Sequence, residues 1–527
     1  MLDTPPFETA QNRLANALTG ISAAQADVKG LLALRMLIAS APPFESSAAY
    51  IPERRALFVL RHIESWLASD DLEDLSDELQ LRLLQLFMVL APIVQSVMGA
   101  HWEMIFDLLE NNLSDDASLE APAPPVLASL VLLRTVRDLA AHNKALRAAW
   151  TNQDVLMRGV VRLFTQCRNR QPSVETGESG TATPLQETAP VQMIHDVILD
   201  LLSGISESMM AESSLPDLAN LLRLLAPPPI QCAAYRLMSR VIKQNTLALV
   251  LEVEASVSEA EEGHASRSIQ LPADLMAIIE QGLILDWHQD VDIRDVLAQL
   301  LAWMAILDHF EDASRTLRWA YLDQLKATDL LDSGLMPMLF AMLGVSQVGA
   351  WNFPAGSYAV DEFYPDLLQP DEMADLTPLA SHLFYRALTT LPAAIRAYHE
   401  SLKDRQLSIS MLTFTARYYS PVIIAHEFAA LRQPAAMSTL TEEGLNVKIA
   451  QGGGATLATG SNAGSSEAIA SYVVDEQPME IGIRLPAEFP LKGVEVRNLR
   501  RIGVPEQKWT KWLVSIQQTV TSRVSQP

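Results

Sequence analysis

Hydrophobic residues recur at helical spacing from about residue 8 to residue 430. Apolar side chains at positions i, i+3, i+4 and i+7 form one apolar stripe on a helix, so each such run predicts a helix that packs on a neighbour. The predicted helices span 28–39, 53–68, 78–90, 93–109, 125–141, 154–167, 191–206, 218–225, 230–253, 272–285, 293–309, 314–325, 335–343, 376–388 and 405–431. Because no strand pattern of similar length interrupts them, the chain is predicted to be mainly α-helical.

Successive helices of this length are typical of a HEAT-like or armadillo-like solenoid, with units of about 40 residues. We assign this solenoid to residues 1–432. The segment from Asp290 to Arg294 resembles the start of the second HEAT helix, in which an Asp caps the helix and an Arg reaches the neighbouring repeat. Residues 229–238 are a second, weaker example. The repeats show no clean self-similarity, so one irregular helical domain is the alternative.

Three segments contain too few apolar residues to pack. Residues 169–190 and 255–267 are rich in small, polar or acidic residues, and we expect both to be mobile loops. The third segment, 451–466, contains several glycines and is predicted to join two strands, 445–450 and 468–474. The alternation of Leu445, Val447 and Ile449 supports the first of these strands.

The last ninety residues change from helical to strand periodicity. Met479, Ile481, Ile483 and Leu485 alternate with polar or small residues, which predicts a half-buried strand that ends at Pro486. A short strand around 494–496 follows, and then an amphipathic helix over about 505–520. Residues 438–527 are therefore predicted to form a small α+β domain after the solenoid.

The order strand, Leu-Pro-x-x-Phe-Pro, strand, loop and helix resembles an RWD domain, a non-catalytic relative of ubiquitin-conjugating enzymes. The sequence around Arg501-Ile-Gly-Val-Pro-Glu-Gln-Lys-Trp509-Thr-Lys-Trp512-Leu resembles the Listerin family of RING-type ubiquitin ligases more closely still. The run Arg417-Tyr-Tyr-Ser-Pro-Val-Ile-Ile is also similar to that family, and within it residues 418–421 are predicted to lie at a helix kink or break and to serve packing rather than to form a site. The resemblance covers about 417–520, and upstream it is only architectural.

Several expectations follow from the resemblance alone. It implies the C-terminal part of a ligase of ribosome-associated quality control, which docks on the large ribosomal subunit near the polypeptide exit tunnel. A RING positioned there would ubiquitinate stalled nascent chains, with its zinc and its ubiquitin-conjugating enzyme held by that RING, which the 527 residues do not contain. The resemblance also implies a cytosolic, ribosome-associated, monomeric protein that binds no membrane.

The sequence offers little for catalysis or for metal binding. Its two cysteines, Cys167 and Cys232, lie far apart, which excludes a disulfide framework and a cysteine-based zinc cluster, and favours the cytosol or the nucleus. We predict no catalytic residue and no metal ligand, because the acidic and His-containing groups at 286–292 and 308–312 are better explained as helix caps and solvated turns. The N-terminus lacks a signal-peptide pattern, and no apolar run is long enough to span a membrane.

Charge is distributed unevenly along the chain. The net charge is −24, yet residues 438–527 contain nine basic and nine acidic residues and are neutral overall. Residues 492–527 contain seven basic residues and only two acidic ones. This local excess of positive charge suits a segment that binds an anionic partner. The predicted ribosome-binding residues are Arg497, Arg500, Arg501, Lys508 and Lys511, which could meet ribosomal RNA phosphates or an acidic ribosomal protein.

The role of the C-terminal helix and of its domain is predicted from the residue types that they contain. Trp509 and Trp512 lie on one helix face, and we expect both to pack the helix onto the sheet rather than to bind a partner. Since a conjugating enzyme needs a thiolate and the chain has no cysteine after Cys232, the C-terminal domain is predicted to dock rather than to catalyse. The competing function is a HEAT–RWD scaffold or adaptor that binds other proteins and has no role on the ribosome.

Overall fold

The computed structural model describes most of the chain. The described residues are 5–42, 50–72, 75–114, 117, 119, 124–151, 153–167, 189–205, 215–223, 226–259, 270–285, 287, 291–346, 359–368, 370–450, 466–474 and 477–524. They form two compact units, which divide between Ser214 and Leu215. Most of the predicted loop 169–190 and nearly all of 451–466 lie outside the described residues.

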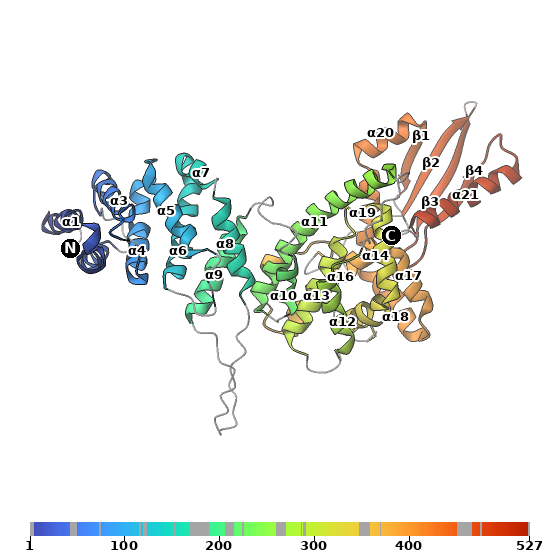
Figure 1. Ribbon diagram of the computed structural model, residues 1–527. Helices are drawn as coiled ribbons and strands as arrows, with labels where there is room; N and C mark the ends of the chain where they lie inside the picture. Colours follow the sequence, from blue (N-terminus) through green and yellow to red (C-terminus); the bar gives the residue numbers. More distant parts are fainter. Residues whose placement is uncertain are drawn as a thin grey trace, which may run out of the picture. The chain divides into compact units, whose positions relative to one another are not determined.

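Unit 1 is built from helices in two layers, as Figure 1 shows. Its helices are α1 (Pro5–Leu18), α2 (Leu31–Ala39), α3 (Glu53–Leu67), α4 (Asp77–Val94), α5 (Ala100–Asn112), α6 (Pro124–His142), α7 (Lys144–Trp150), α8 (Asp154–Thr165) and α9 (Ala189–Ser203). Contacts run from α2 to α4, α6 and α9 in one layer and from α1 to α3, α5 and α8 in the other. This is the stacking expected of a HEAT-like solenoid, because each helix pair packs on the next one.

One predicted boundary in unit 1 is wrong. The sequence suggested that a helix ends at 90 and that another begins at 93, but α4 continues through Pro92 to Val94, and α5 begins only at Ala100. Pro92 lies in the last turn of α4, where its missing N–H and its ring cost the helix the hydrogen bond to the carbonyl four residues earlier. Leu90, Ala91 and Val94 are all buried, and their burial outweighs this local cost.

Unit 2 is also largely helical, and several of its helices pack around one central helix. Its helices before the sheet are α10 (Leu215–Arg223), α11 (Pro228–Glu259), α12 (Ala273–Gln281), α13 (Ile293–Asp308), α14 (Arg315–Ala327), α15 (Met336–Leu343), α16 (Thr377–Thr390), α17 (Pro392–Ser401), α18 (Arg405–Tyr418), α19 (Ser420–Leu431) and α20 (Pro434–Glu442). Every residue of α13 from Val296 to Asp308 is buried, and α10, α11, α12 and α16 pack around it. The central helix therefore fixes the relative positions of α11 and α16.

Three details of unit 2 differ from the sequence-based expectations. Arg294 does not reach a neighbouring repeat, because its guanidinium pairs at 2.6 Å with Asp292, the residue that caps its own helix. Helix α11 extends to Glu259, so the start of the predicted loop 255–267 is helical, and 260–267 lies outside the described residues. The predicted helix 405–431 is two helices, which meet at Tyr419.

Packing explains the break at Tyr419. Its side chain is fully buried, and its hydroxyl forms a 2.9 Å hydrogen bond with the Ser381 hydroxyl of α16. Pro421, in the first turn of α19, is well suited to begin a new helix. The prediction that 418–421 serves packing at a helix break, rather than forming a site, fits this geometry.

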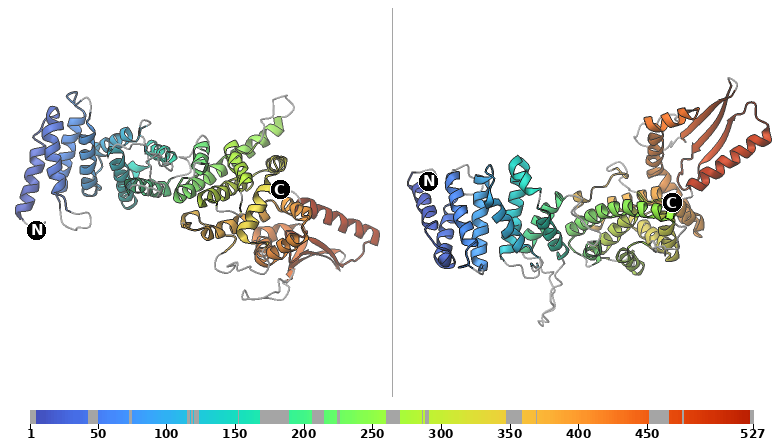
Figure 2. Two further views of the ribbon diagram at one scale, coloured as in Figure 1. Left: turned by 90° about the horizontal axis from the view of Figure 1, so that it is seen from below. Right: turned by 45° about the horizontal axis from the view of Figure 1, so that its top comes forward.

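The C-terminal part of unit 2 is a small domain with an antiparallel sheet, called the sheet domain below (residues 434–524). Its strands are β1 (Leu445–Ala450), β2 (Ser466–Val474), β3 (Gln477–Leu485) and β4 (Glu495–Arg500), in the order β1-β2-β3-β4, and α21 (Glu506–Val524) follows. Helix α20 contacts β1 and α21 contacts β4, as Figure 2 shows. The predicted fold class, a helical solenoid followed by a small α+β domain, is confirmed.

The outer edge of β4 and the loop before it are both held by side chains. The amide of Gln517 on α21 accepts from the Val496 N–H at 2.9 Å and donates to the Val494 carbonyl at 2.8 Å. These bonds occupy backbone groups of an edge strand that would otherwise be open to pairing. The loop that carries Leu-Pro-x-x-Phe-Pro is fastened to α17, because the Arg396 guanidinium donates to the Pro490 carbonyl at 2.9 Å.

Candidate functional site

Neither a cysteine in the sheet domain nor, among the described residues, a cluster of metal-ligand side chains is present. Both cysteines of the sequence are buried in the helical region, Cys167 just after α8 and Cys232 in α11, so the sheet domain has none. Within the described residues no group of three or more His, Cys, Asp or Glu side chains is arranged to hold a metal ion. None of the described helices is both long and apolar enough to cross a membrane.

Four of the five predicted binding residues gather around the turn between β4 and α21. Arg500 is the last residue of β4, Arg501 follows it, and Lys508 and Lys511 lie in the first two turns of α21. All four are exposed. The turn reverses the chain at Gly503, whose φ of 72° favours glycine. Short-range chain geometry thus brings these cations to one end of the sheet domain.

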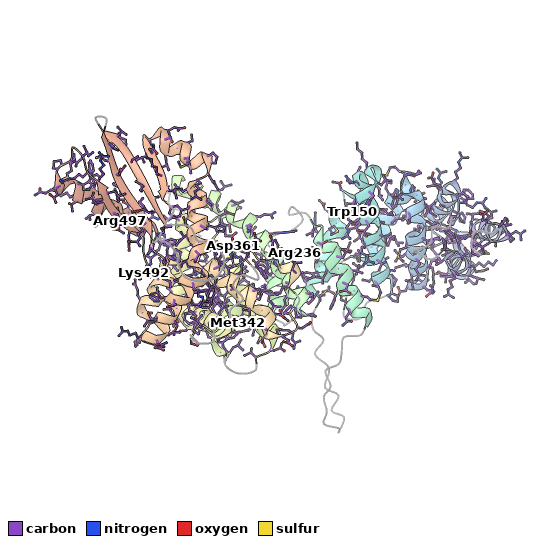
Figure 3. All side chains as sticks on the ribbon, turned by 180° about the vertical axis from the view of Figure 1, so that it is seen from behind. Trp150, Arg236, Met342, Asp361, Lys492 and Arg497 are labelled. Atoms are coloured by element: carbon purple, nitrogen blue, oxygen red, sulfur yellow. The ribbon has the colours of Figure 1, made fainter. Side chains whose placement is uncertain are left out.

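Arg497 lies further back on β4 and has a different environment. Its guanidinium reaches across the sheet to Glu467 of β2, with 3.6 Å between the charged atoms (Figure 3 labels Arg497). The Glu467 side chain passes over Gly482 of β3, where a Cβ would lie only 2.4 Å from its carboxylate oxygen. Gly482 therefore makes this pairing possible. Since Arg497 is half exposed and already paired, it is the least available of the five cations.

Two other cations of the group also have local contacts. Arg501 lies 3.8 Å from Glu506, which is 84% exposed, and such a pair contributes little to stability. The ammonium group of Lys508 lies 5.3 Å from the centre of the Trp512 ring, a cation–π contact. These weak contacts leave the side chains able to reorient toward an anionic partner.

The expectation that both tryptophans pack onto the sheet is right for Trp509 and wrong for Trp512. Trp509 is 3% exposed, and its indole N–H donates to the Asn498 side chain at 3.0 Å. Trp512 is 39% exposed. Three residues along a helix turn by about 300°, which falls short of a full turn, so Trp512 lies beside the buried stripe rather than on it. The exposed Trp512 thus belongs to the same surface as Lys508.

A groove in the helical part of unit 2 is a second candidate site, which the sequence analysis did not find. It encloses about 910 Å³ and is lined by α11, the end of α13, α14, α16 and the segment 361–365. We call it the α11 groove. Figure 3 labels Arg236 of α11 and Asp361 of that segment, which both line it. Its lining residues come from positions more than 150 apart in sequence, so no local pattern could reveal it.

A chain of ion pairs runs along the floor of the α11 groove. The Arg386 guanidinium lies 2.7 Å from the Asp308 carboxylate and 2.7 Å from Glu311, and Lys243 lies 3.0 Å from Glu311. Asp308 is 2% exposed and Arg386 is 9% exposed. Burial raises the pKa of Asp308, while Arg386 acts in the opposite direction. The earlier exclusion of a metal site at 308–312 is consistent with these pairs, since Asp308 and Glu311 have cationic partners.

Next to this floor, His309 is predicted to make the fold sensitive to acid. Burial lowers its pKa to about 4, and within the described residues neither ring nitrogen has a hydrogen-bond partner. The unfolded chain binds a proton near pH 6.5, so stability is lost as the pH falls from about 6.5 towards 4. At pH 5 this amounts to about 2 kcal/mol.

We therefore expect His309→Phe to be more stable than the unmodified chain, by a margin that grows by about 2 kcal/mol between pH 7 and pH 5. Urea unfolding at both pH values measures this margin. The exposed His142→Phe serves as the control and should show no such growth. A margin for His309→Phe that does not change with pH would contradict the assignment of a buried, neutral imidazole.

Two sequence families match the chain. Residues 208–432 match the family described as LTN1 family HEAT repeat region. Residues 458–525 match the family described as ubiquitin conjugating domain-like. The first match covers α10 to α19, and the second covers β2 to α21, so each family corresponds to one part of unit 2. The likeness to conjugating enzymes is one of fold, because the matched residues contain no cysteine.

Curated relatives are similar over larger parts of the chain. The E3 ubiquitin-protein ligase listerin of Neurospora crassa is 24% identical over 97% of this chain and 30% of its own length. That of Schizosaccharomyces pombe is 21% identical over 99% of the chain and 31% of its own length. That of Saccharomyces cerevisiae is 23% identical over 51% of this chain and 16% of its own length. The chain thus spans less than a third of the length of these relatives, and over nearly all of its residues it is a homologue of the listerin E3 ubiquitin ligases.

Proposed function

We propose that this chain is the part of a listerin-type ubiquitin ligase that docks on the large ribosomal subunit. In this proposal the sheet domain binds near the polypeptide exit tunnel, and a RING domain held there ubiquitinates stalled nascent chains. The observation that carries the proposal is the similarity to listerins over 97% of the chain, together with a conjugating-domain-like fold that has no nucleophile. A fold of this kind that cannot carry ubiquitin as a thioester is suited to binding.

The charge of the sheet domain supports the choice of partner. Residues 1–437 carry the whole net charge of −24, while residues 492–527 have a local excess of five positive charges. Four exposed cations gather where β4 turns into α21. A ribosomal surface is strongly anionic, and cations near its phosphates release counterions on binding. The surface around Arg500, Arg501, Lys508 and Lys511 is thus the part of the chain best suited to this contact.

The proposed contribution to the reaction is proximity. A RING-type ligase accelerates transfer by holding the loaded conjugating enzyme close to its target, and effective concentration is the main gain. A ubiquitin-conjugating enzyme is therefore a partner of the whole ligase. By the resemblance zinc would belong to the RING, and the two distant, buried cysteines here do not fit as its ligands. The residues of this chain bind and position, and no bond-making step is assigned to them.

A double charge reversal tests the docking surface. We expect Arg500→Glu with Arg501→Glu to weaken co-sedimentation with purified large ribosomal subunits by about tenfold or more, since two phosphate contacts become repulsive. The control is Arg432→Glu with Lys448→Glu, which changes the net charge equally at exposed positions elsewhere in unit 2. Equal binding by the two double variants would remove the assignment of this surface.

A further inference from the structure

The α11 groove is not used by the proposed docking function. Its volume of about 910 Å³ lies in the range of small-ligand and peptide sites. Its lining combines charged groups, hydroxyls and aromatic rings from four helices and the segment 361–365. The buried pair of Arg386 with Asp308 joins α16 to α13, so these two walls are held in place before any ligand binds.

The charges of the lining limit the class of ligand. The basic lining residues are Arg236, Arg240, Lys243, Arg318 and Arg386. The acidic lining residues are Asp308, Glu311, Asp312, Asp361 and Glu362. Equal numbers of acids and bases disfavour a polyanion such as nucleic acid, and also a purely basic partner. The charged floor disfavours a lipid, because burying charges under an acyl chain costs free energy.

The two signs of charge lie on different elements. Arg236, Arg240 and Lys243 are spaced i, i+4 and i+7 and thus lie on one face of α11. Asp361 and Glu362 lie on the segment before the short helix η7 (Pro365–Leu367), which contacts α11. A ligand in the groove therefore meets cations of α11 and carboxylates of this segment, of which Asp361 already accepts from the His426 ring at 2.7 Å. A chain with side chains of both signs complements this arrangement.

Aromatic groups provide the remaining contacts. Phe363 stacks on His382, with 5.6 Å between ring centres, and His382 stacks on Tyr385 at 6.2 Å. Burial lowers the pKa of His382 to about 4, so its ring is neutral at pH 7 and adds no charge to the groove. This row of rings offers a surface for an apolar or aromatic side chain, as is common in peptide-binding grooves.

From these features we propose that the α11 groove is a binding site for an extended peptide segment of a partner protein, with acidic, basic and aromatic side chains. The acidic side chain contacts the cations of α11, the basic one contacts the exposed Glu362, and the aromatic one packs on the row formed by Phe363, His382 and Tyr385. This site is independent of the docking surface on the sheet domain. Losing one should leave the other intact.

Selection from a random peptide library on the immobilised full chain tests the proposal. We expect enriched peptides to carry both signs of charge and at least one aromatic residue. The variant Arg240→Glu with Lys243→Glu should bind the enriched peptides at least about tenfold more weakly, because two charge-assisted contacts become repulsive. The single change Arg315→Glu is the control, since Arg315 is exposed on α14 and does not line the groove.

Two further measurements separate a lost site from a lost fold. The thermal melting of the double variant, and of the single variant Lys243→Glu, shows whether the fold is kept, and the single variant should melt close to the unmodified chain because Lys243 is half exposed. An enriched peptide whose acidic residue is replaced by Lys should regain binding to the double variant. Enrichment of peptides with a single sign of charge, enrichment that survives the double variant, or no enrichment at all would each overturn the proposal.

Discussion

Replacing Trp509 by Ala is expected to destabilise the sheet domain by about 3–5 kcal/mol. The indole is almost fully buried between α21 and the sheet, and it donates its N–H to Asn498 on β4. Its removal leaves a cavity and an amide oxygen without that donor. Because the core of a domain this small rarely supplies more than about 3–5 kcal/mol, this change should leave it largely unfolded. Hydrogen exchange of the β3 and β4 amides measures the loss directly.

Trp512→Ala is the matched control for this prediction. Its ring is 39% exposed and contacts Lys508 on the surface, so we expect a loss of about 1 kcal/mol or less. The two tryptophans are three residues apart on the same helix, and they differ in burial and in the hydrogen bond that Trp509 donates to Asn498. Similar loss of protection in the two variants would show that the assignment of one buried and one exposed indole is wrong.

The second large effect is expected at the floor of the α11 groove. Arg386→Ala should destabilise unit 2 by about 3–5 kcal/mol, because it leaves the buried Asp308 carboxylate without its cationic partner. The pKa of Asp308 is already raised by burial, and without Arg386 it rises further. A raised acid pKa favours folding at low pH, so the penalty should grow as the pH rises through that pKa. Urea unfolding across pH measures both quantities.

Variants at the other end of the ion-pair chain are informative controls. Lys243→Ala removes only the half-exposed pair with Glu311 and should cost about 1 kcal/mol or less. Replacing Asp308 and Arg386 together, by Leu and Met, should recover much of the stability lost in Arg386→Ala, since no buried charge is left alone. A cost for Lys243→Ala as large as that for Arg386→Ala would contradict the described burial.

Sequence patterns predicted most of the fold because their signals are local. The alternation at 479–485 corresponds to β3, and the amphipathic run at 505–520 corresponds to α21. The errors occur where packing overrides a local signal. Pro92 stays within α4 because its neighbours are buried, and nearby residues do not reveal this packing. The break at Tyr419 was predicted from residues 418–421, but the contact of Tyr419 with Ser381 of α16 was not.

The candidate sites differ in the same way. The cations at 500–511 could be found from sequence, because they lie close together in the chain, around the turn between β4 and α21. The α11 groove could not be found, since Arg386 and Asp308 are 78 residues apart and meet only through the packing of α13 against α16. The sequence analysis interpreted residues 308–312 as caps and solvated turns and did not predict their partner in α16. Only the tertiary structure shows that these charges form the floor of a groove.

Co-sedimentation of the full chain with purified large ribosomal subunits, at low and at moderate salt, tests the central claim most directly. The account predicts saturable binding at low salt that weakens steeply as salt rises, because released counterions drive the contact. It also predicts that the double reversal at Arg500 and Arg501 removes this salt-sensitive part. Absence of binding at low salt, or binding whose strength changes neither with salt nor in the double reversal, would contradict a docking role for the sheet domain.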